Sequence, residues 1–354
     1  MDRTDEGVQV HEVGANQNQP SVSTRMSYSY HAWRKLHELI SNHSIDVVNA
    51  EFFLAEGFLH ALTKGEIPLV LHAHAWAEGW IENSTLLGRC ERHFASSAEK
   101  YTAHRADRII ATSKSTKQWL VEKAGLRKDK VTVIYEFIDT ELYRPVKSTF
   151  RARVGVPEGF PMVLFVGKLT PRKGPTVFAR SIPYILRKKP DTRFVVIGRD
   201  TDMSPNGTSM KAYIESLARV RSTMNNIIFT GMVPRLDVIE AYSACDVFVY
   251  PGLLEAGGLA SLEAMACNCP IVATSTGLAA ELTGISPAFR VVTPGNEQEL
   301  AEAILQLLQI PRDELKRQAG VHRKIVEERF ATERMVTEIL SSYEEVISRS
   351  PHVN

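Results

Sequence analysis

The sequence predicts an α/β fold made of two Rossmann-like domains, each a doubly wound parallel sheet, which face a cleft between them. Three observations predict it. Short apolar runs rich in β-branched and aromatic residues alternate with longer helical patterns along the chain. In the second half these runs are continuous, which is typical of strands buried on both faces. The 354 residues, 44% of them hydrophobic, are enough for two core-bearing domains of roughly 150 residues each.

The first domain is expected to span residues 1–145. Its strand candidates are residues 8–13, 45–50, 68–73, 108–112 and 131–135. Helical patterns lie between them, notably at residues 31–40 and at residues 116–125, where Gly125 would end the helix. The polar, proline-containing segment DTELYRPVKSTF at residues 139–150 indicates the boundary with the next domain.

The second domain is expected to span residues 146–330. Its strand candidates are residues 162–166, 194–198, 227–230, 247–250, 271–274 and 289–292. Crossover helices are predicted over residues 176–189, where Pro183 introduces a kink, and over residues 299–308. A last helical pattern at residues 333–347 lies in a C-terminal segment, residues 331–354, which fits either domain.

Composition argues against several classes of protein. A net charge of +1 gives no overall field to attract nucleic acid. Four cysteines, three of them clustered, do not make a disulfide framework and favour a reducing compartment. The charged start MDRTDEGVQVHEV does not look like a signal peptide, and no apolar run reaches the roughly 18 residues of a membrane span. We therefore expect a cytoplasmic protein.

Two acids and two glycines stand together in YPGLLEAGGLASLEAMACNCP at residues 250–270. The segment follows a predicted strand, so it lies where open α/β sheets bind ligands. A helix is expected over residues 258–267, and its first N–H groups suit a phosphate. Gly257 and Gly258 let a diphosphate approach the backbone. Glu255 and Glu263 can accept hydrogen bonds from vicinal sugar hydroxyls.

Cations for such phosphates stand in FVGKLTPRKGP at residues 165–175, which also follows a predicted strand. Lys168 and Lys173 flank a turn that contains Pro171, and they would neutralise a leaving diphosphate. Each residue alone has a simpler explanation, because a glutamate eight residues from another is often a solvated helix position and a lysine after a strand is often merely exposed. Their common placement at one sheet edge favours a functional site.

These motifs resemble those of the retaining GT-B glycosyltransferases of family 4, over residues 163–310. The resemblance lies in VGKLTPRKG, in YPGLLEAGGLASLEAMACNCPIVAT and in STGLAAEL. In the first domain, IPLVLHAHAW and ADRIIATSKS match well, and VIYEFID at residues 133–139 matches in outline. The resemblance implies the GT-B fold, a nucleotide diphosphate sugar donor such as a UDP- or GDP-hexose, and no other cofactor.

The resemblance also implies roles for individual residues. Glu255 would contact the hydroxyls of the donor sugar, and His74 falls on the position of the family's active-site histidine. Lys168 and Lys173 would bind the donor diphosphate and act in catalysis. The remaining donor-binding positions are the ribose-binding Glu263, the helix start at Gly257, Gly258 and Leu259, and the base-pocket loop at Met232 and Val233.

The chain departs from the family pattern at several positions. Lys168 replaces an arginine, which keeps the charge but loses the bidentate fork. Ala256 and Gly257 replace Gly-Phe, and Glu136 and Phe137 replace Asn-Gly. Smaller changes are Gly252 for a serine and Asn268 for a glycine. The chain also starts at a strand where family members begin with a further strand, Gly-rich loop and helix.

Three other interpretations stay open. His72 and His74 point to one face of a strand, as in metal-dependent hydrolases, but no further histidine occurs between His104 and His322 to complete a site; we therefore expect no metal. Cys245, Cys267 and Cys269 could suggest a metal site, but a fourth ligand is missing, and they are better explained as small buried residues. Residues 25–39, with Trp33, mix aromatic and basic side chains; this pattern fits peripheral contact with the inner face of a membrane, or a helix packed into its domain.

The function that follows is a hexosyltransferase. It would move a hexose from a nucleotide diphosphate sugar to a glycan, lipid-linked or small-molecule acceptor, with retention at the anomeric carbon. Positive side chains and a helix end would stabilise the leaving diphosphate. The alternative is a non-catalytic homologue or truncated partner subunit that only binds the nucleotide sugar.

Overall fold

The computed structural model describes residues 2–5, 7–13, 22–63, 67–76 and 86–349. The chain divides into two compact units, one of Met1–Ile134 with Thr337–Asn354 and one of Tyr135–Val336. The division at residue 134 lies a few residues before the segment in which the sequence placed the domain boundary. Both units contain a parallel sheet with helices, so the expected α/β class with two Rossmann-like sheets is confirmed.

The second unit is built on a six-stranded parallel sheet in the order β12-β11-β10-β7-β8-β9. Its strands are β7 (Met162–Val166), β8 (Arg193–Ile197), β9 (Ile227–Gly231), β10 (Val247–Tyr250), β11 (Ile271–Thr274) and β12 (Phe289–Val292). The order runs outward in both directions from the central pair β7 and β10, where Val247 lies opposite Val163. This is the doubly wound arrangement, and the β7–β10 pair marks its switch point.

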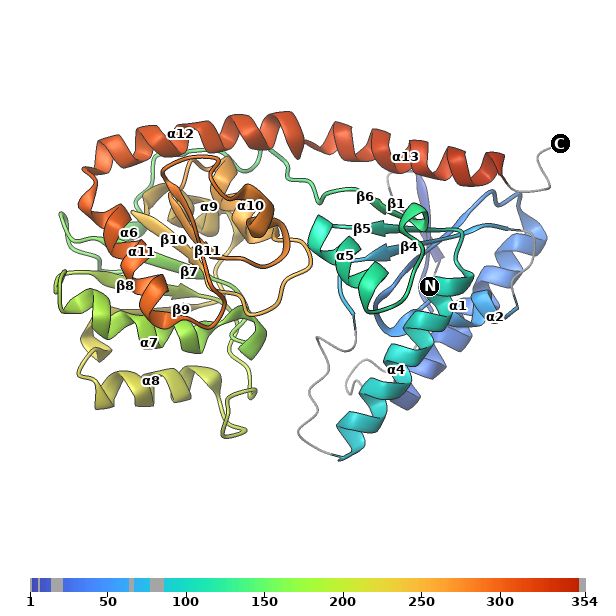
Figure 1. Cartoon of the computed structure of the whole chain (residues 1–354), viewed down its shortest axis with the longest axis horizontal. Helices are drawn as coiled ribbons and strands as arrows, with labels where there is room; N and C mark the ends of the chain where they lie inside the picture. The colour runs from blue at the N-terminus through green and yellow to red at the C-terminus, as the bar shows by residue number, and fades with distance from the viewer. Residues whose placement is uncertain (1, 6, 14–21, 64–66, 77–85, 350–354) are drawn as a thin grey trace. The chain divides into compact units, whose positions relative to one another are not determined.

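Helices cover both faces of this sheet, because alternate residues of each strand point into separate cores. Leu164 belongs to the core beneath α9 and α10, whereas Val163 and Phe165 belong to the core beneath α7, α8 and α11 (Figure 1). The helices are α6 (Phe150–Arg153), α7 (Pro175–Leu186), α8 (Met210–Val220), α9 (Arg235–Ala244), α10 (Leu259–Ala266), α11 (Glu297–Gln309) and α12 (Arg312–Arg329). Short 3-10 turns are η3 (Pro171–Lys173), η4 (Met224–Asn226) and η5 (Gly277–Leu282).

The first unit holds a four-stranded parallel sheet in the order β3-β4-β5-β6. Its strands are β3 (Val48–Glu51), β4 (Leu69–Ala73), β5 (Arg108–Ala111) and β6 (Val131–Val133). Its helices are α1 (Val22–Asn42), α2 (Phe58–Leu62), α4 (Leu86–Arg105) and α5 (Lys114–Glu122), with 3-10 turns η1 (Phe53–Ala55) and η2 (Lys128–Lys130). In α1, Trp33 is half-buried and donates to Thr63 Oγ1 at 3.0 Å, which fits the packing interpretation of that helix.

The prediction that residues 8–13 contribute a strand to the parallel sheet of the first domain is wrong. Residues 8–13 do not join the parallel sheet; β2 (Val8–His11) instead pairs antiparallel with β1 (Asp2–Asp5) in a separate two-stranded sheet. Gly7, at φ +86°, lies in the tight turn between them. Val8 is 64% exposed, so this strand has no buried face to place it in a larger sheet.

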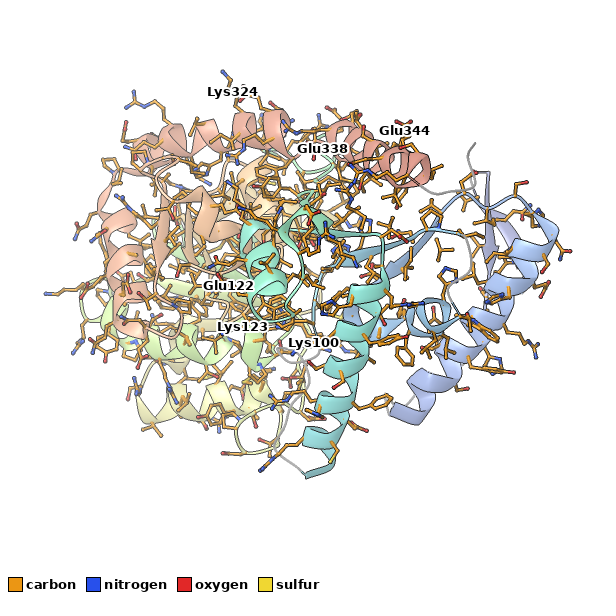
Figure 2. The ribbon with its side chains drawn as sticks, turned by 45° about the vertical axis from the view of Figure 1, so that its right-hand side comes forward. Lys100, Glu122, Lys123, Lys324, Glu338 and Glu344 are labelled. Carbon is orange, nitrogen blue, oxygen red and sulfur yellow. The ribbon has the colours of Figure 1, made fainter. Side chains whose placement is uncertain are left out.

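The C-terminal segment forms the helix α13 (Thr332–Ser348), which begins in the second unit and from Thr337 onward belongs to the first. Its buried residues are Ser342 and Val346. Glu345 Oε2 forms an ion pair with the guanidinium Nη2 of Arg108 in β5 at 2.7 Å. Figure 2 shows the outward faces of α12 and α13, where the exposed Lys324 and Glu344 are labelled. Such a division into a buried and a charged face is what an amphipathic surface helix requires.

Candidate functional site

The loops that follow β7 and β10 meet at the carboxyl edge of the second unit's sheet. Leu253 N–H donates to the carbonyl of Arg172 at 2.7 Å, which joins the two loops. Gly174 makes this approach possible: its φ is +69°, and a Cβ there would overlap the carbonyl oxygen of Pro251. The switch point of the sheet therefore brings together the two segments that the sequence singled out, FVGKLTPRKGP and YPGLLEAGGLASLEAM.

Glu255 lies at the centre of this junction and is only 7% exposed. Its Oε1 accepts from the Arg172 guanidinium at 2.8 Å and from Lys173 Nζ at 2.8 Å. Lys173 Nζ also donates to the hydroxyl of Tyr250 at 3.0 Å. Burial, together with the neighbouring Glu255 carboxylate, raises the pKa of Tyr250 well above its usual value, so this hydroxyl keeps its proton. One buried carboxylate thus fixes two cations in a water-poor setting.

The amino end of α10 starts directly after this cluster. Gly258 precedes the first helical residue with φ +148°, a backbone conformation that favours glycine. Leu259 begins the helix and is 43% exposed, so the helix start reaches the surface. The N–H of Gly258 donates to Glu136 Oε2 at 3.2 Å, and the carbonyl of Gly257 accepts from the N–H of Leu278 at 2.9 Å. A helix start that holds a carboxylate is able to hold a phosphate.

Glu263 lies one turn into α10 and is held from two sides. Its Oε1 accepts from the Tyr143 hydroxyl at 2.9 Å, and its Oε2 accepts from the Tyr242 hydroxyl at 3.0 Å. Burial raises the pKa of Glu263, and burial together with the neighbouring Glu263 carboxylate raises the pKa of Tyr143 well above its usual value. Each carboxylate oxygen keeps a second lone pair, so a ribose diol would have to bind alongside the two tyrosines.

The other donor-binding residues expected from the sequence lie at the same edge with fewer contacts. Lys168 is exposed in the loop after β7. Met232, directly after β9, is 73% exposed. Val233 is half-buried and packs against the core on the α9–α10 face. An exposed methionine at the carboxyl edge of the sheet can cover the flat face of a base.

His74 belongs to the first unit, directly after β4. Its Nε2 lies 3.7 Å from Glu51 Oε1, and its ring stacks with that of His72 at a centroid distance of 5.7 Å. Burial raises the pKa of Glu51, while the neighbouring His74 lowers it. Burial lowers the pKa of His72 to about 4, so His72 is neutral at physiological pH. The carboxyl edge of this sheet therefore carries a histidine–carboxylate pair that can orient or take up a hydroxyl proton.

Three residues of these clusters were missed by sequence reasoning. Arg172 stands beside Lys173 in the quoted segment and was overlooked there as one more surface cation. Glu136 is 122 positions from Gly258 in sequence, and Glu51 is 23 residues before His74, so no local pattern joins either pair. Of the three, only Arg172 could have been recognised from the sequence, because it stands next to the expected phosphate-binding lysine and a guanidinium can form paired hydrogen bonds with a phosphate.

Two kinds of feature were searched for in the described part of the chain: metal-ligand groups and membrane-spanning helices. Across residues 7–13, 22–63, 67–76 and 86–349, no three histidine, cysteine, aspartate or glutamate side chains are grouped to hold a metal ion. Within the same residues no helix combines the length and apolarity that a bilayer crossing needs. Cys245, Cys267 and Cys269 are buried thiols, as expected, and Cys90 is exposed.

Two family models match the chain. One, described as glycosyl transferases group 1, matches residues 146–322; the other, described as glycosyltransferase family 4, matches residues 2–142. A D-inositol 3-phosphate glycosyltransferase from Kineococcus radiotolerans is 29% identical over 66% of this chain and 54% of its own length. The same-named protein from Nocardia farcinica is 30% identical over 77% of this chain and 60% of its own length. The match thus spans little more than half of each of these relatives.

Solved structures with similar folds include sucrose-phosphate synthase from Thermosynechococcus elongatus. It has a TM-score of 0.83 and 19% identity, over 98% of this chain and 86% of that one. Anabaena Alr3699/HepE in complex with UDP-glucose has a TM-score of 0.72 and 22% identity, over 93% of this chain and 84% of that one. At these identities the similarity concerns the fold.

Proposed function

The chain belongs to the group 1, family 4 glycosyltransferases of GT-B fold, and from this premise we propose that it transfers a hexose from a nucleotide diphosphate sugar to a hydroxyl acceptor with retention. The observation that carries the proposal is the Glu255 cluster: a buried carboxylate paired with Arg172 and Lys173, placed beside a glycine-lined helix start at the switch point. Such a site offers cations and N–H donors to a diphosphate, and an acceptor oxygen to the sugar.

The contacts support a division of labour within the cluster. Arg172 and Lys173 would turn from Glu255 toward the diphosphate, because a phosphate oxygen competes with a carboxylate for the same donors. Glu255 Oε1 would then accept from the sugar hydroxyls. As the glycosidic bond breaks, negative charge grows on the leaving diphosphate, and the two cations stabilise it more than they stabilise the ground state.

The donor is proposed to carry uridine, because Anabaena Alr3699/HepE was solved with UDP and with UDP-glucose. Met232 and Val233 are proposed to line its base, and Glu263 to bind its ribose. The acceptor is proposed to be a small polyol or sugar phosphate, since the relatives bear the names D-inositol 3-phosphate glycosyltransferase and sucrose-phosphate synthase. His74 with Glu51 is proposed to bind a hydroxyl of the acceptor.

The proposal is tested by calorimetry with UDP, GDP and ADP, followed by a transfer assay with the corresponding glucose donors. We expect one nucleoside diphosphate to bind in the micromolar range, about −8 kcal/mol, and its sugar to be hydrolysed or transferred. Binding without turnover over any acceptor would favour a non-catalytic nucleotide-sugar-binding homologue. Absence of binding by all three nucleotides would refute the proposal.

A further inference from the structure

We propose that Glu136 is a built-in competitor for the donor diphosphate: its carboxylate occupies the anion position at the start of α10 and must leave when the donor binds. The inference rests on the proposed function and deepens it, because it concerns the regulation of the same site. In VIYEFID, Glu136 departs from the pattern that this segment resembles, which has an asparagine there, and the departure adds a negative charge.

The position of the carboxylate is fixed by two observations. Its Oε2 accepts from the N–H of Gly258 at 3.2 Å. A Cβ added to Gly257 would overlap both oxygens and the carboxyl carbon of Glu136. The carboxylate therefore lies flat against the glycine pair that leaves room for a diphosphate, and it uses one of the N–H donors that a phosphate would need.

The backbone on both sides of Glu136 is anchored within the second unit. The Tyr135 hydroxyl donates to Glu281 Oε2 at 2.7 Å, and the Tyr135 ring packs edge-on against Phe330 at 5.4 Å. On the other side, Ile138 N–H donates to the carbonyl of Phe330 at 3.0 Å. The segment therefore presents the side chain to the helix start from a fixed backbone, and rotation of that side chain is the motion that clears the site.

The negative charge of Glu136 opposes the binding of a diphosphate at the start of α10. Around the helix start lie the carboxylates of Glu136 and Glu255, and Glu255 already pairs with the cations of Arg172 and Lys173. A diphosphate that entered beside Glu136 would meet a like charge at close range and a donor already in use. Glu136 therefore lowers the affinity for every anion at this position, whatever base or sugar is attached, and it favours release of the nucleoside diphosphate product.

The test compares two variants with equal change in net charge. Glu136→Gln keeps the shape but removes the charge, and Glu141→Gln makes the same change at an exposed position five residues along the same segment. We expect Glu136→Gln to bind UDP and inorganic pyrophosphate about three- to tenfold more tightly than wild type, as loss of one charged competitor at a helix start would give. Glu141→Gln should stay within about twofold, since exposed charges are screened.

Thermal unfolding of each variant checks that it folds, and Glu136→Ala is the second variant should Glu136→Gln be unstable. Equal or weaker binding in the Glu136 variants, with wild type binding normally, would overturn the competition and leave the proposed function in place. Such a result would mean that Glu136 only caps the helix. Failure of wild type and all variants to bind either probe would overturn the proposed function, and the competition with it.

Discussion

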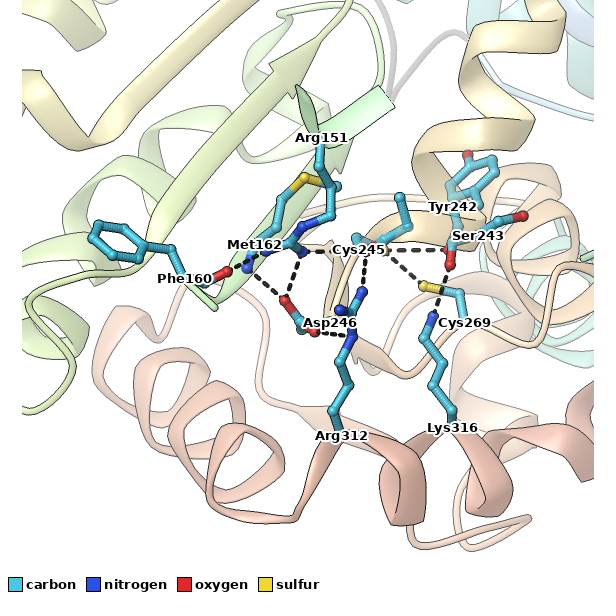
Figure 3. A network of polar contacts seen from close by, with 11 residues as sticks. Arg151, Phe160, Met162, Tyr242, Ser243, Cys245, Asp246, Cys269, Arg312 and Lys316 are labelled. Atoms are coloured by element: carbon cyan, nitrogen blue, oxygen red, sulfur yellow. Dashed lines mark hydrogen bonds and ion pairs between the residues drawn. The ribbon is translucent and has the colours of Figure 1, made fainter. Parts of the chain in front are cut away.

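A cluster of one carboxylate and two cations lies at each end of strand β10, and the two clusters differ in their hydrogen bonds. At its carboxyl end, Glu255 pairs with Arg172 and Lys173. At its amino end, Asp246 pairs with Arg151 at 3.0 Å and with Arg312 at 3.0 Å (Figure 3). Each cluster is one carboxylate with two cations, and both carboxylates are largely buried.

The difference lies in how the remaining hydrogen-bonding capacity is used. Asp246 Oδ2 also accepts from the backbone N–H of Met162 at 2.7 Å, and the guanidinium of Arg312 donates to the carbonyl of Ala244 at 3.0 Å. Both Asp246 oxygens are thus engaged with groups that hold α6, β7, α9 and α12 together. Glu255 holds both of its cations through Oε1, beside an exposed helix start. We therefore expect the amino-end cluster to keep its partners and the carboxyl-end cluster to exchange them for a ligand.

Position in the sheet accounts for the difference between the two carboxylate–cation clusters. Parallel strands direct their carboxyl ends, and the helix starts that follow, to one edge, and their amino ends to the other. Local composition does not distinguish the two edges here. We therefore expect substitutions at the amino end to change stability and those at the carboxyl end to change chemistry.

The largest expected effect is at the amino end. Asp246→Ala should lower the free energy of unfolding by about 3–5 kcal/mol, because it leaves the half-buried Arg151 guanidinium and the Met162 N–H without their acceptor. Denaturant unfolding measures this loss, with Asp313→Ala on the exposed first turn of α12 as control. A change below about 1 kcal/mol, the range of a surface ion pair, would erase the contrast between the two ends.

The carboxyl end should respond in activity. Glu255→Gln is expected to reduce hexose transfer by about 10²–10³-fold, as loss of one preorganised electrostatic partner does. Nucleoside diphosphate affinity should be kept or improved, because Arg172 and Lys173 lose their internal counter-ion. Rates of transfer and calorimetry on the same preparation separate the two effects. Wild-type turnover in this variant would remove Glu255 from the reaction centre.

Much of the second unit could be predicted from its strands. Residues 162–166, 247–250, 271–274 and 289–292 are strands over the expected bounds, because burial on both faces demands a continuous apolar run. The helix α12 was missed, since its buried side is a single row of Leu315, Ala319, His322 and Val326 in an otherwise charged sequence. Residues 8–13 were misassigned because their partner, β1, is a polar tetrapeptide with no hydrophobic signal.

The arrangement of the candidate site was predictable where residues directly follow strands of the doubly wound sheet, and not where other long-range contacts decide it. Lys173 and Glu255 were placed correctly at one edge because each follows a strand of a doubly wound sheet. The partners of Glu263 could not be foreseen, since Tyr143 lies 120 positions away. Glu136 likewise reaches Gly258 only because its segment is anchored to Phe330. Contacts of this kind depend on tertiary structure rather than on any local pattern.

A pH experiment sharpens the contrast at the amino end. His322 of α12 is buried beside Cys269, whose carbonyl lies 3.0 Å from Nδ1, and its Nε2 lies 2.7 Å from Ser286 Oγ. Burial lowers the pKa of His322 from 6.5 to about 4. As the pH falls, His322 is therefore protonated near pH 6.5 in the unfolded chain but only near pH 4 in the folded chain. Stability present above pH 6.5 should be lost across this window, by about 3 kcal/mol in all.

Denaturant unfolding of wild type and His322→Gln at pH 7.5 and pH 4.5 measures that contribution. The variant should lose less stability between the two pH values than wild type does, because glutamine does not titrate. Nucleotide affinity at pH 7.5 should be the same in both proteins. An unchanged pH slope in the variant would show that other groups carry the acid sensitivity.

The smallest expected effect compares one lysine from each end of the sheet. Lys173 Nζ contacts Glu255 and Tyr250 at the carboxyl edge, whereas Lys316 Nζ donates to the carbonyl of Ser243 at 3.2 Å at the amino edge (Figure 3). Lys173→Ala should weaken UDP binding about tenfold, or about 1.4 kcal/mol, the typical net value of one charge-assisted hydrogen bond. Lys316→Ala makes the same change in charge and should leave the dissociation constant within about twofold, since its charge is distant from the site and screened. Calorimetry at one fixed ionic strength compares them directly. Equal weakening in both variants would mean that the two lysines act through overall charge, and that the carboxyl edge of the sheet has no specific role in binding UDP.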